Sequence, residues 1–119
     1  MLDSFDSRNP EDYLKGFLFH PHRGIETISY LRSGAMTHRD HLGNQSTVKD
    51  GGVQWMTAGS GIIHEETPHA ADRMLGVQVW LNMKADDKMS DPLYYDIPTD
   101  KIPEVEIEVA GEKLKKKQP

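Results

Sequence analysis

The sequence predicts an all-β domain, folded either as a sandwich or as a barrel. Residues 25–31 and residues 73–82 alternate apolar and polar side chains, as half-buried strands do. Turns rich in glycine separate these segments from other short runs of the same kind. No stretch of ten or more residues carries the apolar spacing of an amphipathic helix. Short strands at regular spacing with glycine turns are typical of sandwiches and barrels.

The strands are predicted from this alternation, taken in chain order. They are expected at residues 25–31, 35–39, 53–57, 62–64, 73–82 and 104–110. Turn signals separate them at residues 33–34, 42–44, 49–52 and 58–61. Residues 1–19 open with polar turn formers, residues 85–89 suggest a helical turn, and residues 92–103 are expected to be irregular.

Chain length, charge and composition limit the classes of protein to which this sequence can belong. A chain of 119 residues is about one domain, which we place at residues 1–110, followed by a flexible basic tail at residues 111–119. The net charge of −5 argues against direct binding to nucleic acid. The absence of cysteine leaves only nitrogen and oxygen as metal ligands. No apolar run could span a membrane, and the polar N-terminus is unlike a signal peptide, so we expect a soluble, cytoplasmic protein.

Two short motifs carry potential metal ligands at the same spacing. His20 and His22 are separated by one residue, and so are His64 and Glu66. In a strand, residues i and i+2 project from the same face, so each pair would point in one direction and Glu65 would point away. Two such strands side by side would offer three imidazoles and one carboxylate to one divalent transition ion, with coordination positions left open for a substrate.

The same two segments resemble a known family. HPHRGIETISYLRSG, from residue 20, and DGGVQWMTAGSGIIHEETP, from residue 50, are similar to the pirin family, a branch of the cupin superfamily. The run of residues 54–61 before the second ligand pair resembles pirins rather than cupins in general. The resemblance extends over roughly residues 15–105. It implies a cupin-type β-barrel, or jelly-roll sandwich, of which this chain would hold the N-terminal, metal-binding domain, shortened at its N-terminal edge.

The pirin resemblance implies the same four ligands, with iron as the usual ion. These are His20, His22, His64 and Glu66. Iron(II) is therefore the expected cofactor, although nitrogen and oxygen ligands also accept manganese, cobalt, nickel, copper or zinc. Glu26 is expected on the face of His20 and His22, and the resemblance implies that the matching Glu is a ligand in many cupins. In pirins the carboxylate comes from the second motif, so we expect Glu26 to join a hydrogen-bond network behind the ligands.

Three expectations concern assembly and the remaining side chains. A barrel that lacks its first strands would expose a sheet edge and an apolar face, which predicts a homodimer. His38 flanks the turn that follows the strand at residues 35–39 and is expected at the surface, with a position beside the metal site as the alternative. The aromatic residues Phe19, Trp55 and Trp80 are expected in the core.

The pirin resemblance implies a function. It indicates a metal-dependent dioxygenase of the quercetinase type, which opens the ring of a flavonol with dioxygen. Glu66, as a weakly held carboxylate, would be the general base that removes the proton of the substrate hydroxyl. The alternative is a non-enzymatic metal-binding protein that acts as a redox-responsive protein-interaction module or transcriptional cofactor.

Overall fold

The computed structural model describes residues 1–109 and 112–117, and it confirms the all-β prediction. In chain order the strands are β1 (Leu2–Ser7), β2 (Phe17–His22), β3 (Ile25–Ser33), β4 (Met36–Asp40), β5 (Gln45–Val48), β6 (Val53–Thr57), β7 (Ile62–Pro68), β8 (Met74–Asn82), β9 (Leu93–Ile97), β10 (Glu104–Val109) and β11 (Glu112–Lys117). Single 3-10 turns are η1 (Pro10–Asp12), η2 (Ala85–Asp87) and η3 (Thr99–Lys101). Within the described part of the chain, no helix has the length and apolar character needed to cross a membrane.

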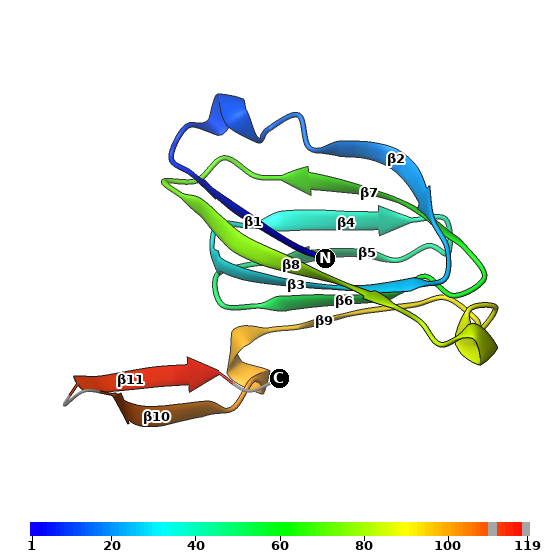
Figure 1. The fold of residues 1–119 in the computed structure, drawn as a ribbon. Coiled ribbons are helices and arrows are strands. Elements are labelled where there is room, and N and C mark those ends of the chain that lie inside the picture. The colour runs from blue at the N-terminus through cyan, green and yellow to red at the C-terminus, as the bar shows by residue number, and fades with distance from the viewer. Residues whose placement is uncertain (110–111, 118–119) are drawn as a thin grey trace.

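The strands form two antiparallel sheets that face each other (Figure 1). One sheet has the order β1-β8-β3-β6-β9, and the other has the order β2-β7-β4-β5. A hydrogen bond from Ser46 on β5 to Asp96 on β9 links the two sheets along one side. β1 and β2 are the end strands at the opposite side, and in the described part of the chain each pairs along one edge only. The β10–β11 hairpin lies apart from both sheets (Figure 1).

The structure contains several strands that the sequence pattern did not predict. β1, β5 and β9 are short, and β9 lies inside the segment expected to be irregular. Residues 112–117 of the segment predicted as a flexible tail form β11, which pairs with β10, whereas residues 111, 118 and 119 lie outside the described residues. Residue 110, the predicted end of the last strand, lies outside them too.

The space between the sheets is polar in the middle and apolar at both ends. One apolar cluster consists of Leu31, Met36, Val48 and Met74, and the other consists of Met56, Ala58 and Ile62. Between them lie buried polar side chains, namely Thr27, Ser29, His38, Gln54, His64 and Glu66. A buried polar group is costly unless it has a partner, so such a layer in the centre of a small domain indicates a functional site.

Two glycines allow close approaches that shape this interior. A Cβ atom on Gly76 of β8 would lie 2.7 Å from Cζ of Phe5, whose ring packs over that position. Gly16 has a positive φ of 60°, and a Cβ there would lie 2.3 Å from the carbonyl oxygen of Glu66. Only glycine fits such a site without strain. Gly16 therefore lets the start of β2 lie directly against β7.

The unpaired edge at β2 carries exposed apolar side chains. Phe17, Leu18 and Phe19 are 63%, 79% and 57% exposed. The prediction that Phe19 belongs to the core is therefore wrong, because β2 is an edge strand and, among the described residues, no sheet packs against its outer face. An apolar edge strand favours association, so a homodimer stays a prediction. Light scattering at micromolar concentration should give the mass of two chains, and a clean monomer would contradict it.

Candidate metal centre

Three neighbouring strands each place an i, i+2 pair on the same inner surface. β7 lies between β2 and β4, and it pairs antiparallel with both. In the register, His20 on β2 faces His64 on β7, and Asp40 on β4 faces His64 from the other side. His38 on β4 lies opposite Glu66. β7 therefore alternates as predicted: His64 and Glu66 are buried, while Glu65 points outward and pairs with Arg39.

The three predicted imidazole ligands converge. His20, His22 and His64 each offer a ring nitrogen, and these nitrogens lie within 4.8 Å of one another. The Nε2 atoms of His20 and His64 are 3.0 Å apart. The ring centroids of His22 lie 4.8 Å from His20 and 4.9 Å from His64. The ring of His22 also contacts Trp80 of the opposite sheet, with centroids 5.1 Å apart.

Glu66 lies beside this group rather than within it. Its carboxylate belongs to a second set with His38 and His64, again with ligand atoms within 4.8 Å of one another. Oε1 of Glu66 is 3.9 Å from Nδ1 of His64, the ring nitrogen opposite the one that approaches His20. The four residues predicted as ligands therefore meet at His64, whose Nε2 faces His20 and whose Nδ1 faces the carboxylate of Glu66.

His38 is the site residue that the sequence analysis placed wrongly. It is 1% exposed, not at the surface, and its Nδ1 lies 3.4 Å from Nδ1 of His64. Its other ring nitrogen, Nε2, lies 2.7 Å from Oδ2 of Asp40. The pair His38 and Asp40 has the same spacing as the two recognised pairs, and that repetition is the signal that could have found it. The turn that follows β4 made the segment look exposed.

Glu26 lies on β3, in the sheet opposite β2 and β7. Its Oε1 accepts a hydrogen bond of 2.9 Å from Oγ1 of Thr57 on the neighbouring strand β6. Thr57 lies directly opposite Glu26 in the register. The buried residues of β3 are its alternate neighbours Thr27 and Ser29, so Glu26 lies on the other face of its sheet, away from the interior. The expectation that Glu26 shares a face with His20 and His22, in a network behind the ligands, is therefore wrong.

Burial sets the protonation of the central groups. Burial, followed by the charges of His20, His22 and His38, lowers the pKa of His64 to about 3. Burial also lowers the pKa of His38, against the opposing effect of Asp40, and it raises the pKa of Glu66 to about 7. The imidazole of His64 is therefore neutral at physiological pH, which is the form that binds a metal.

These shifts predict how the stability of the metal-free protein depends on pH. His64 contributes stability that is present above pH 6.5 and is lost as the pH falls through about 3, because the unfolded chain binds that proton more readily. Glu66 acts in the opposite direction: its contribution is present below pH 4.5 and is lost as the pH rises through about 7. We therefore expect Glu66→Gln to make the free energy of unfolding rise more steeply between pH 4.5 and 7.

The difference in slope should reach up to about 1.4 kcal/mol per pH unit, the value for one proton. Urea denaturation of both metal-free proteins at half-unit steps of pH measures it. Glu65→Gln, which makes the same change on the outer face, should follow the wild-type profile. Parallel profiles for Glu66→Gln and the wild type would contradict the raised pKa of Glu66.

The donor set fits a divalent transition ion. Nδ1 of His20 lies 2.7 Å from the carbonyl oxygen of Leu18, which can only accept, so the ring proton belongs on Nδ1 and the lone pair on Nε2. That lone pair faces Nε2 of His64 at 3.0 Å. Two nitrogens bound to one first-row ion at about 2.1 Å are roughly 3.0–3.4 Å apart for ordinary bond angles. The spacing therefore suits two ligands of one ion.

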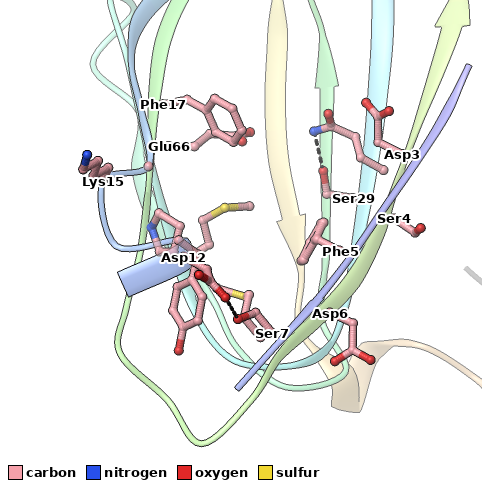
Figure 2. A pocket seen from close by; sticks show the side chains of 16 residues that line it. Asp3, Ser4, Phe5, Asp6, Ser7, Asp12, Lys15, Phe17, Ser29 and Glu66 are labelled. Carbon is pink, nitrogen blue, oxygen red and sulfur yellow. Dashed lines mark hydrogen bonds between the residues drawn. The ribbon is translucent and has the colours of Figure 1, made fainter. Parts of the chain in front are cut away.

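A cavity of about 650 Å³ opens between the sheets beside Glu66 (Figure 2). Glu66 and Phe17 line one side of it, and Phe5 and Ser29 line the other. Met36 and Met74 add apolar surface. Its volume lies within the range of roughly 300–1,000 Å³ that is usual for small-molecule sites. Glu66 therefore belongs both to a group of potential metal ligands and to the wall of a space that could hold a small molecule.

Known proteins are similar to this chain in sequence and in fold. A relative from Pseudomonas aeruginosa, named "Putative quercetin 2,3-dioxygenase", is 50% identical over 107 residues, which cover 89% of this chain and 38% of the relative. A solved quercetin 2,3-dioxygenase from Acinetobacter baumannii superposes with a TM-score of 0.82 at 36% identity, over 96% of this chain and 42% of that one. A bacterial pirin from Escherichia coli, solved in complex with nickel(II), has a TM-score of 0.60 at 34% identity, over 69% of this chain and 35% of that one.

The chain thus spans about two fifths of the length of the curated relatives it matches. The family model described as Pirin matches residues 1–81, which include β2, β4 and β7 with all the histidines and carboxylates of the candidate centre. With that match and half of the aligned positions shared with the Pseudomonas relative, this chain belongs to the pirin family.

Proposed function

We propose that this chain carries the metal site of a dioxygenase of the quercetinase type, which opens the ring of a flavonol with dioxygen. The observation that carries the proposal is the convergence of His20, His22 and His64 next to Glu66, which lines a cavity. The names of the Pseudomonas relative and the Acinetobacter structure support the substrate class.

Iron(II) is the proposed ion, held by the three imidazoles with Glu66 as the fourth ligand. The nickel(II) complex of the Escherichia coli pirin supports a transition-metal site in this family without fixing the ion here. When bound, such an ion supplies a Lewis acid that favours the deprotonated form of a substrate hydroxyl.

Glu66 is the proposed base for that hydroxyl. Its pKa of about 7, raised by burial, suits proton transfer near neutral pH. It also lines the cavity, so a hydroxyl of a bound molecule can come within hydrogen-bond reach of the carboxylate. The apolar side chains Phe5, Met36 and Met74 would pack against the flat rings of a flavonol and exclude water.

The test is turnover by protein of defined metal content. Protein stripped with chelator is reloaded separately with iron(II), manganese, cobalt, nickel, copper or zinc, and quercetin is added under air. We expect loss of quercetin absorbance together with dioxygen uptake for at least one redox-active metal, and no reaction for the stripped protein. Zinc-loaded protein is the matched control, because the zinc ion has no redox chemistry.

If metal-loaded protein consumes quercetin and dioxygen no faster than a solution without protein, the proposed dioxygenase activity is contradicted. Metal content measured on the same samples separates this outcome from simple failure to bind the ion. Bound metal without turnover would favour the non-enzymatic metal-binding alternative.

A further inference from the structure

Behind the metal-binding side of His64 lies a chain of hydrogen-bonding groups that ends in a fixed carboxylate. It runs from Asp40 through His38 to His64, over contacts of 2.7 Å and 3.4 Å. We infer that Asp40 and His38 are positioning residues, which hold the ring proton of His64 on Nδ1 and thereby direct its Nε2 lone pair at the metal. The inference rests on the metal site of the proposed function, but not on the flavonol as substrate.

The first step is the orientation of Asp40. Its Oδ1 accepts hydrogen bonds from the backbone N–H groups of Leu42 and Asn44 and from Nδ2 of Asn44. Oδ2 accepts a second bond from Nδ2 of Asn44 and faces Nε2 of His38. The donors around Oδ1 belong to the turn itself, so the carboxylate can point only one oxygen at His38.

The contact with Asp40 fixes the tautomer of His38. A carboxylate only accepts hydrogen bonds, so the nitrogen that faces it, Nε2, must carry the ring proton. In the neutral ring, Nδ1 then holds the lone pair. The ring cannot easily turn to change this, because it is 1% exposed and stacks on Tyr94 with centroids 3.7 Å apart and planes 3° from parallel.

The tautomer of His38 in turn determines the tautomer of His64. Nδ1 of His38 is an acceptor, so Nδ1 of His64, 3.4 Å away, must be the donor. The neutral His64 ring then has its lone pair on Nε2, the atom that faces Nε2 of His20. Since His20 also presents a lone pair there, two unprotonated nitrogens face each other across 3.0 Å, an arrangement that a cation relieves and a hydrogen bond cannot.

The contacts from Asp40 through His38 to His64 predict the effect of Asp40→Asn. The asparagine oxygen would remain with the three donors now bound to Oδ1, so its NH₂ group would point at His38. Nε2 of His38 would become the acceptor, its proton would move to Nδ1, and Nδ1 of His64 would become the acceptor in turn. His64 would then carry its proton on Nε2, where the metal must bind. A single amide in place of the carboxylate thus reverses the tautomers of both His38 and His64.

The experiment measures tautomers and metal affinity together. Long-range ¹H–¹⁵N spectra of ¹⁵N-labelled protein at pH 8 report which nitrogen of each neutral ring carries the proton, in the metal-free and zinc-loaded forms. In the wild type we expect Nε2–H for His38 and Nδ1–H for His64, with zinc on Nε2 of His64. In Asp40→Asn we expect Nε2–H for His64 in the metal-free form.

Zinc affinity, measured by competition with a chelating dye, should fall about 10- to 100-fold in Asp40→Asn, the range for partners that orient a ligand. The matched control is Asp50→Asn. Asp50 also accepts a backbone N–H, that of Gly34, at a turn outside this chain of groups. Asp50→Asn should bind zinc as the wild type does.

Several outcomes would overturn the inference. These are a wild-type His64 that carries its proton on Nε2, zinc bound to Nδ1 of His38, or wild-type zinc affinity in a folded Asp40→Asn protein. The wild-type tautomers decide the matter even if the variant does not fold. Protein that shows the expected tautomers but leaves quercetin unchanged would reject the dioxygenase and keep the positioning role.

Discussion

Replacing His64 with alanine is expected to abolish metal binding, whereas replacing its neighbour Glu65 should leave binding unchanged. His64 is the residue shared by both groups of potential ligands, so its loss removes the centre of each. The zinc affinity should fall by more than the roughly 10- to 100-fold typical for a supporting partner. Glu65 lies on the outer face and pairs with Arg39 at 3.8 Å, so Glu65→Ala should lose only a weak surface ion pair.

Metal content after purification without chelator, together with zinc titration of the stripped protein, measures this difference. Circular dichroism of the two metal-free variants checks that both remain folded. Equal losses of metal in His64→Ala and Glu65→Ala would mean that β7 does not present alternate residues to opposite faces. The metal centre as described could not then exist.

The parts of this site that the sequence predicted are those governed by a local rule. The strand period of two places His64 and Glu66 on one face of β7 without any knowledge of the neighbours. The same rule predicted the two faces of β8, of which Met74 and Gly76 are buried. Where a strand is long and one face is buried, its pattern survives in the sequence.

The strands missed by the sequence pattern are those formed by their neighbours. β1 has the sequence LDSFDS and exposes most of its side chains, so little in its composition indicates a strand. Six consecutive residues nevertheless pair with β8 in register. β9 lies between Pro92 and Pro98, and these two prolines made the sequence of this short strand look like that of a loop. Strand formation at such places depends on the partner strand more than on intrinsic propensity.

His38 shows the same limit for a functional residue. Its burial depends on β7 on one side and on Tyr94 of β9 on the other, and β9 was not predicted. Its partner Asp40 is drawn inward by a turn whose hydrogen bonds are visible only in the structure. The recurrence of the i, i+2 spacing on a third strand was in the sequence, but only the register of β4 with β7 gives that spacing a meaning.

Replacing Glu66 with glutamine is expected to reduce flavonol oxidation far more than metal retention. The three imidazoles form a group without Glu66, so they should keep most of the ion when the carboxylate is lost. An amide cannot accept the substrate proton at neutral pH, and loss of a general base commonly costs about 10²- to 10⁴-fold in rate. The side chains have nearly the same shape, so the wall of the cavity should be preserved.

The decisive measurement is quercetin consumption per bound metal, with both quantities taken from one preparation. Glu65→Gln is the matched control, since it makes the same chemical change one residue away on the opposite face, and it should retain wild-type values. If Glu66 is chiefly a ligand, metal and activity should fall in parallel and the rate per bound ion should stay constant. If it is chiefly the base, the ion should remain while the rate per ion collapses. The placement of the carboxylate at the cavity wall, 3.9 Å from the far nitrogen of His64, favours the second result. Full activity in Glu66→Gln would remove the carboxylate from the reaction, and the proton of the flavonol would then need another acceptor.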